Sequence, residues 1–303
     1  MRRGDAALHR SKNDGEGRAY CFFTSTMDKQ LKDQFQLEQA LRRGLERDEL
    51  LLHFQPRVDM ATGQIQSLEA LVRWLHPEQG LLPPHRFIPV AESSGLILSL
   101  GPLVLRKTCE QIQRWRAAGI PVVPVAINLT TQELYKQGLV TEVLGTVSQH
   151  DIDPALLEFE ITESTAMRSI DDARAILSEL KTAGFTLSLD DFGTGYASMS
   201  YLSNLPVHGL KIDQSFIAEL ERDPARCRQT MAIVDAMIGL GLNLGLEVVA
   251  EGVETPTQRD FLMAHRCTRG QGFLFSHPQP ADVIGSLLQD GSPLPVAPDQ
   301  TRP

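Results

Sequence analysis

From about residue 50 onward, short β-like runs alternate with amphipathic helical stretches, and this alternation limits the fold more than any other feature. The expected strands are Leu51–Val58, Ile65–Trp74, Val122–Leu129, Leu156–Thr162, Thr186–Asp191, Gly209–Asp213, Leu246–Glu251 and Gly272–Phe275. The expected helices between them include Gly101–Ala118, Ile170–Thr182, Ala225–Leu240, Thr257–His265 and Ala281–Leu288. Strands that alternate with helices form a mainly parallel sheet whose outer face the helices cover.

The connection between the first two expected strands is only Met60–Gln64, which is short enough for a hairpin. One of these two strands therefore runs antiparallel to the other. Eight strands in about 240 residues suit a closed barrel. We predict an α/β fold, a (β/α)8 TIM-like barrel with one antiparallel strand near its start. A doubly wound open sheet is the alternative, but no GxGxxG motif opens a helix here.

The predicted barrel occupies residues 50–290, and shorter segments flank it. Residues 27–49 have an apolar stripe that includes Leu31 and Phe35, which predicts a helix. That helix either packs on the barrel or connects it to an upstream domain, and we assign it as a connector helix. The proline-rich residues 291–303 predict a disordered tail.

Composition narrows the class of protein and its partners. A net charge of −9 argues against binding of a nucleic-acid duplex through a broad basic surface. The four cysteines lie far apart without a CxxC pair, as in a cytoplasmic protein with reduced thiols. No signal peptide is visible and no apolar run reaches the roughly 20 residues that span a bilayer. We expect no membrane contact by this segment, although a longer parent protein could be membrane-tethered.

Polar side chains occur at or near the carboxyl ends of most expected strands. These ends share one rim of a parallel barrel, where active groups lie. Adjacent carboxylates repel each other, so Asp190 and Asp191 are kept together mainly when a cation needs them. The following Gly193 and Gly195 let the backbone turn sharply beside a ligand. The other members of this set are Glu69, Arg73, Asn128, Glu160, Glu163, Lys211, Glu251 and Gln271.

Each of these residues alone has an ordinary structural explanation. A glutamate near a strand end can be a loop cap or a surface ion pair, Asn128 can be a turn residue, and Lys211 can extend its ammonium to solvent. Surface charge would scatter over both ends of the barrel, so a set confined to one rim indicates a site. We expect these rim side chains to be exposed, so that Glu69→Ala or Lys211→Ala abolishes turnover with little loss of stability.

The side-chain chemistry of the set indicates the reaction class. Oxygen ligands suit Mg2+ or Mn2+ rather than zinc. Five carboxylates are already too many for one hydrated Mg2+ but fit two cations that share a bridging carboxylate. Such a pair activates a water and clamps a phosphodiester, while Lys211 could orient or deprotonate that water or stabilise the developing charge. The residues therefore predict a two-metal phosphoester hydrolase.

With these residues assembled, residues 33–290 closely resemble the EAL family of cyclic di-GMP phosphodiesterases. The resemblance lies in motifs that occur in family order: LHFQPRVDMATGQI, EALVRW, INLTTQEL, FEITES, DDFGTGYASMSYLSNLP, LKID, AEGVET and QGFLF. It implies hydrolysis of cyclic di-GMP to linear pGpG, with two Mg2+ or Mn2+ ions per active site and inhibition by Ca2+. It also implies metal ligands, which are Glu69, Asn128, Glu160, Asp190 as the bridge, Asp191 and Glu251.

The same resemblance implies roles for the remaining site residues. Lys211 and Glu251 position the attacking water, and Gln271 orients that water or the lysine. Gln55 and Arg73 hold the substrate, with Arg73 on a phosphate.

Further implications concern the loop that follows Asp190, the oligomeric state and the parent protein. Glu163 and Glu254 resemble the residues that fix the DDFGTGY loop, which the family links to dimerisation, so we expect a homodimer. Residues 4–23 resemble the end of a GGDEF domain, which includes its last helix. We therefore expect residues 1–26 to be a remnant of an upstream GGDEF-like domain, and this chain to be the C-terminal part of a GGDEF–EAL protein with upstream GGDEF or sensor domains.

Two other classes of function stay open. The chain could be a catalytically silent cyclic di-GMP receptor or regulatory module, or a scaffold that only dimerises. Silent family members usually lack a metal ligand or the catalytic lysine, and all of these are present here.

Overall fold

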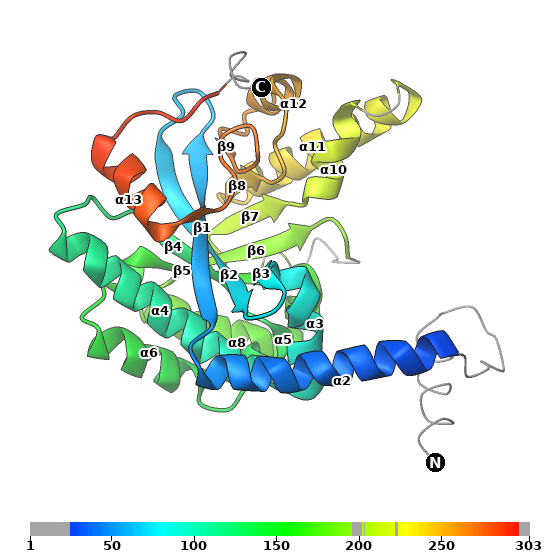
Figure 1. Cartoon of the computed structure of the whole chain (residues 1–303). Coiled ribbons are helices and arrows are strands. Elements are labelled where there is room, and N and C mark those ends of the chain that lie inside the picture. Colours follow the sequence, from blue (N-terminus) through cyan, green and yellow to red (C-terminus); the bar gives the residue numbers. More distant parts are fainter. Residues whose placement is uncertain (1–24, 196–201, 203, 222–223, 297–303) are drawn as a thin grey trace. The chain divides into compact units, whose positions relative to one another are not determined.

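The computed structural model describes residues 25–195, 202, 204–221 and 224–296. The chain divides into two compact units, one containing residues up to Leu50 together with Trp74–Leu96, and the other Leu51–Arg73 with the chain from Ile97 onward. The predicted GGDEF-like remnant at residues 1–26 lies almost entirely outside the described residues. Figure 1 labels the elements along the chain.

The second unit contains the barrel. Among the described residues, eight strands form a closed ring in the order β1-β9-β8-β7-β6-β5-β4-β2, and β2 pairs with β1. The strands are β1 (Leu50–Asp59), β2 (Ile65–His76), β4 (Val125–Asn128), β5 (Leu157–Thr162), β6 (Thr186–Phe192), β7 (Gly209–Ile212), β8 (Glu247–Ala250) and β9 (Arg269–Gly270). The pairs from β2 through β9 are parallel, whereas β1 runs antiparallel to β9. The predicted barrel with one antiparallel strand near its start is confirmed.

The β1–β2 hairpin forms where the short connection predicted it. Asp59 Oδ1 accepts hydrogen bonds from the backbone amides of Ala61 and Thr62, as an aspartate does in a tight turn. Gly63 takes a left-handed φ of 73° that few other residues adopt. A further short strand, β10 (Gln279–Pro280), pairs antiparallel with β1.

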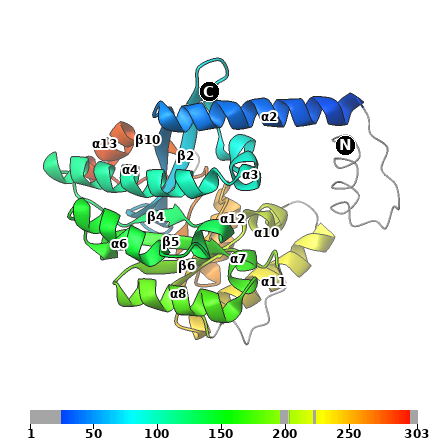
Figure 2. The ribbon, with the colours of Figure 1, turned by 90° about the horizontal axis from the view of Figure 1, so that it is seen from below.

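Helices cover the outer face of the strands, as Figures 1 and 2 show for α4, α6, α8 and α11. The helical segments of this unit are α4 (Ile97–Ala117), α5 (Thr131–Leu134), α6 (Leu139–Gln149), η1 (Pro154–Leu156), α7 (Glu163–Met167), α8 (Ile170–Thr182), α10 (Gln214–Ala218), η2 (Glu219–Glu221), α11 (Pro224–Asn243), α12 (Pro256–Ala264) and α13 (Ala281–Asp290). Helix α8 buries Ala173, Leu177 and Leu180, which share one face. These join the strand residues Leu157 and Leu187 in one apolar core.

The first unit consists of α2 (Ser25–Glu46), β3 (Gly80–Leu82) and α3 (Pro84–Ser94) with the end of β2. Strand β3 pairs antiparallel with that end of β2, with Trp74 opposite Leu82. The Trp74 indole donates to Glu49 Oε2 at 3.1 Å and meets the Phe87 ring edge-on. The predicted helix within residues 27–49 is present as α2, and its role as a connector stays a prediction. In the described ranges, none of the helices has the length and apolar character needed to cross a membrane.

Two sequence-based expectations need correction. The eighth strand is Arg269–Gly270 and not Gly272–Phe275. Gly272 lies so close to the backbone of Val253 that a Cβ there would overlap it, and the run that follows forms a turn. The expected disordered tail begins with ordered chain, because Leu294 is buried and its amide donates to the Gly63 carbonyl at 2.8 Å. Residues 297–303 lie outside the described part.

Candidate active site

The polar residues predicted at the strand ends meet at one end of the barrel. The strand register places Asn128 directly opposite Glu160, while Asp190 lies opposite Thr162, two residues beyond Glu160, and Lys211 lies opposite Val249, two residues before Glu251. Each of the seven cluster members lies on, or immediately after, a different strand from β2 to β9. They are Glu69, Asn128, Glu160, Asp190, Lys211, Glu251 and Gln271. The parallel strands thus bring together side chains that are far apart in sequence.

Lys211 lies at the centre of this cluster and is only 1% exposed. Its Nζ is 2.5 Å from Glu251 Oε1, 3.0 Å from Glu160 Oε2, 3.1 Å from Asp190 Oδ1 and 3.7 Å from Glu69 Oε2. Burial alone would lower the pKa of Lys211, but the surrounding carboxylates raise it well above its ordinary value. The expectation that Lys211 and Glu69 are exposed rim residues is therefore wrong, since Glu69 is also buried.

Glu69 is held by amide groups on both oxygens. Asn128 Nδ2 donates to Glu69 Oε1 at 2.7 Å, and Gln271 Nε2 donates to Glu69 Oε2 at 2.7 Å and to Gln55 Oε1 at 3.0 Å. Burial acts to raise the pKa of Glu69, but Lys211, Arg57 and these two amides lower it to about 2. Glu69 is therefore an anion at neutral pH.

Arg57 on β1 is a member of this site that the sequence analysis missed. Its Nε donates to Gln271 Oε1 at 3.0 Å, its Nη1 to Glu158 Oε1 at 3.2 Å, and its Nη2 to Glu160 Oε1. Only 2% of its side chain is exposed. An arginine buried at an inward-facing strand position could have been suspected from the sequence LHFQPRVDM, because a charge there needs a partner.

Asp190, Asp191 and Glu251 form the group best suited to a cation. Each offers one carboxylate oxygen, and these oxygens lie within 4.8 Å of one another. Asp191 has a left-handed φ of 53°, and its amide donates to Asp190 Oδ1 at 2.9 Å. Burial and the neighbouring Asp190 raise the pKa of Asp191 to about 6, and burial raises that of Glu251 to about 7 despite Lys211. Carboxylates with raised pKa values fit a site in which a hard divalent cation would neutralise their negative charge.

The structure also locates the residues that were assigned to the loop. Glu163 is buried at the start of α7, and its Oε2 accepts from the Gly193 amide at 3.0 Å. A Cβ on Gly195 would overlap the Glu163 carboxylate, so the described part of the loop passes close over it. Glu254 has an exposed side chain whose carboxylate bonds to none of the described residues, although its amide donates to Gln258 Oε1.

The two residues expected to hold the substrate, Gln55 and Arg73, lie at the edge of the cluster. Gln55 donates to the Ser276 carbonyl at 3.1 Å and accepts from Gln271. Arg73 is half-buried and donates to its neighbour's Val72 carbonyl at 2.9 Å. Within the described residues, no hydrogen bond or ion pair joins Arg73 to the acidic cluster, so most of its N–H donors are available to a substrate.

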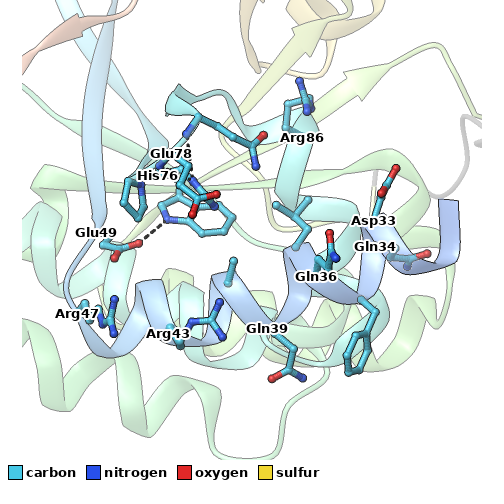
Figure 3. Close-up of a pocket in the computed structure, with 16 residues that line it drawn as sticks. Asp33, Gln34, Gln36, Gln39, Arg43, Arg47, Glu49, His76, Glu78 and Arg86 are labelled. Atoms are coloured by element: carbon cyan, nitrogen blue, oxygen red, sulfur yellow. Dashed lines mark hydrogen bonds between the residues drawn. The ribbon is translucent and has the colours of Figure 1, made fainter. Parts of the chain in front are cut away.

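A cavity of about 230 Å³ opens beside the cluster, and Gln55, Glu69, Glu251, Glu254 and Gln271 are among its lining residues. A larger pocket, of about 860 Å³, lies within the first unit. Figure 3 shows that pocket, with Arg43 of α2 and Arg47, which follows that helix, among its lining residues and the hydrogen bond between Trp74 and Glu49 beside it. The larger pocket contains none of the predicted site residues.

The fold and the site define a class: an α/β barrel whose acidic and cationic residues meet at the carboxyl ends of the strands. The family model described as "EAL domain" matches residues 38–278, and the chain belongs to the EAL domain family.

Several relatives share most of the chain. It is 43% identical over 284 residues to the bifunctional diguanylate cyclase/cyclic di-GMP phosphodiesterase MucR of Pseudomonas aeruginosa, a match that covers 94% of this chain and 41% of MucR. It is 42% identical over 289 residues to the cyclic di-GMP phosphodiesterase NbdA of the same organism, covering 95% of this chain and 36% of NbdA. The chain thus spans about two fifths of the length of these relatives.

Solved structures agree with the fold. The structure described as the PaMucR phosphodiesterase in complex with c-di-GMP aligns with a TM-score of 0.78 and 44% identity, covering 82% of this chain and 99% of that one. The EAL domain of Mycobacterium smegmatis DcpA aligns with a TM-score of 0.67 and 35% identity, covering 81% of this chain and 98% of that one.

Proposed function

We propose that this chain hydrolyses cyclic di-GMP to linear pGpG with the help of two divalent cations, Mg2+ or Mn2+. The observation that carries the proposal is the convergence of Glu69, Glu160, Asp190 and Glu251 around the single ammonium of Lys211. Its substrate follows from the phosphodiesterase relatives and from the bound c-di-GMP that is named for the MucR structure.

The donor set fits hard cations. The residues that would hold them are Glu69, Asn128, Glu160, Asp190, Asp191 and Glu251, which offer carboxylate and amide oxygens and no sulfur or imidazole. When bound, two such cations supply an acidified water and neutralise the charge that develops on the phosphodiester. The Asn128 amide would have to turn its oxygen outward, because its nitrogen now faces Glu69.

The chain's own residues perform the proton transfers and the positioning. Lys211 and Glu251 lie in contact, so that one proton can be shared between the attacking water, the carboxylate and the ammonium. Gln271 restrains Glu69 through its amide, and thereby the geometry of the cluster. Gln55 and Arg73 would hold the substrate from the edge, with the Arg73 guanidinium on a phosphate.

Regulation and assembly belong to the same proposal. Glu163 would anchor the loop after Asp190 through the Gly193 amide, with Glu254 as a second anchor. We propose a homodimer, and GGDEF or sensor domains upstream in the full protein. Ca2+ would bind the oxygen ligands but inhibit turnover, because it takes more ligands at longer distances than Mg2+ does.

Turnover of cyclic di-GMP by the purified chain tests the proposal. Product is followed by chromatography with Mg2+, with Mn2+, with Ca2+ and with EDTA. Formation of pGpG that requires Mg2+ or Mn2+ and stops with Ca2+ or EDTA is expected. Saturable cyclic di-GMP binding without product in any metal would replace the enzyme by the receptor, and no nucleotide binding at all would favour a scaffold.

A further inference from the structure

The guanidinium of Arg57 donates hydrogen bonds to three different side chains inside the barrel, and its Nη2 also lies 3.8 Å from Glu69 Oε2. Nε donates to Gln271, Nη1 to Glu158 and Nη2 to Glu160. Arg57 lies on β1, the antiparallel strand, whereas the proposed ligands come from the strands parallel to one another. A planar guanidinium with donors in fixed directions can hold several acceptors in one arrangement, which a lysine cannot do.

The first consequence concerns the Gln271 amide. Because Arg57 Nε–H can only donate, it requires the amide oxygen on its side, and the Gln271 nitrogen is then directed to Glu69 Oε2 and Gln55 Oε1. The opposite orientation of the Gln271 amide would place its oxygen against the Glu69 carboxylate and its NH2 group against the N–H of the Arg57 guanidinium. Arg57 thereby selects the orientation in which Gln271 restrains Glu69.

The second consequence concerns the Glu160 carboxylate. Arg57 binds its Oε1, and Lys211 lies 3.0 Å from its Oε2. The arginine thus fixes one oxygen from the interior and leaves the other directed toward the rim. Glu158 in turn receives Arg57 Nη1 and the Ser188 hydroxyl, so the guanidinium is itself held in place.

We propose that Arg57 is a positioning residue that presets Glu160 and Glu69 for cation binding and turnover, the latter through Gln271 and through its own ion pair with Glu69. The proposal rests on the proposed function, in which these carboxylates hold the cations. Partners behind metal ligands typically contribute about 10–100-fold to metal affinity, and misplacement of a reacting group by about 1 Å can cost about 100-fold in rate.

The test compares two variants. Arg57→Met removes the positive charge, and Arg57→Lys keeps the charge but lacks the planar guanidinium with its fixed donor directions. Mn2+ affinity is measured without substrate from the electron paramagnetic resonance signal of free Mn2+, and kcat and KM are measured separately. For both variants we expect Mn2+ affinity about 10-fold weaker or more and kcat lowered by about 100-fold, with KM changed far less. Circular dichroism selects the folded variants, and Arg57→Lys serves if Arg57→Met does not fold.

The direction of the change in Mn2+ affinity is decisive. If Arg57 contributed only positive charge, its removal would tighten Mn2+ binding, and Arg57→Lys would behave as the wild type. Either result overturns the proposal, as does wild-type kcat in Arg57→Met.

Arg269→Met is the matched control, because Arg269 is an arginine on another barrel strand, β9, whose guanidinium pairs with Glu247 Oε1 at 2.7 Å, and neither residue belongs to the proposed site. It should stay near wild type in Mn2+ affinity and kcat, and an equal loss there would mean general disturbance of the barrel and overturn the proposal. Absence of turnover in the wild type would refute the hydrolase and not the Arg57 inference, which the Mn2+ affinities still decide.

Discussion

The Lys211 ammonium lies 2.5 Å from Glu251 Oε1, and this ion pair joins a buried lysine to a partly buried glutamate where the proposed cations would bind. A lysine in that position supplies a fixed positive charge among carboxylates that would otherwise repel one another. The same contact allows proton exchange between the two groups and an attacking water.

Replacing Lys211 by alanine should lower kcat by about 100-fold or more, because a positioned proton donor or acceptor contributes at least that much. It should also destabilise the metal-free protein by about 3 kcal/mol, since buried carboxylates lose their partner. Steady-state kinetics and thermal melting with and without Mn2+ measure both effects. Lys181→Ala, at an exposed position near the end of α8, is the control. Near-normal kcat in Lys211→Ala would contradict the role of Lys211.

Replacing Glu163 by alanine should free the loop without removing a proposed metal ligand, because Glu163 Oε2 accepts from the Gly193 amide. We expect kcat to fall by about 10-fold or more through misplacement of Asp190 and Asp191. Hydrogen exchange at Gly193 should become faster in parallel. Gly195→Ala disturbs the same contact from the loop side and should behave alike. Unchanged exchange and kcat in both variants would exclude the anchoring role.

Cation binding should depend on pH in a defined window. The pKa values of Asp191 and Glu251 are raised to about 6 and about 7, so both are largely protonated below pH 6 and must lose protons to bind a cation. Calorimetry of Mn2+ binding in buffers of different ionisation enthalpy should show proton release at pH 6 and much less at pH 8. Glu251→Gln should reduce the release at pH 6, and a release independent of pH would refute the assignment.

The stability of the metal-free protein should respond to the same two groups. Their pKa values in the folded protein exceed the ordinary values of 3.8 and 4.5. The native state therefore holds more protons than the unfolded state between about pH 4 and pH 7. Their contribution to the free energy of unfolding falls as pH rises through that window. Comparing denaturation of the wild type and Glu251→Gln from pH 5 to pH 8 measures it, with a shallower decline expected in the variant.

Adding Mn2+ should raise the melting temperature, because cations bind the folded cluster and not the unfolded chain. At about 100 times Kd the stabilisation is about 2.7 kcal/mol, or roughly 5–10 °C for a domain of this size. Ca2+ should also stabilise while it blocks turnover. Asp190→Asn, which removes the proposed bridge, should lose most of the shift. A full shift in that variant would place the cations elsewhere.

Gly272→Ala should destabilise the protein and reduce kcat together. A Cβ at Gly272 would overlap the Val253 backbone, and the strain would displace the adjacent Gln271. Gly145→Ala in α6 is the control, because nothing lies within 4 Å of a Cβ there. That change should be neutral or stabilise by about 0.5–1 kcal/mol. Denaturant unfolding and kinetics of both variants check the contrast, and equal effects would refute it.

The sequence by itself determined the barrel and most of its acidic rim. Strand and helix periodicities are local patterns, and the short connection before Ile65 predicted the antiparallel strand. Asp190 and Asp191 end an apolar run, so their place at a strand end followed from neighbouring residues alone. The topology of a parallel barrel then implies that such ends share one rim.

Only the tertiary structure decided the contacts within that rim. Arg57 meets Glu160 across 103 positions of sequence and Gln271 across 214, and no local pattern encodes such a pair. The turn at Gly272 likewise depends on the backbone of Val253, although its apolar residues resemble a strand. Burial of Lys211 is decided the same way, because strands from the whole barrel enclose it. Periodicity reports which face of an element is apolar, whereas the partner of a buried charge depends on how distant elements pack.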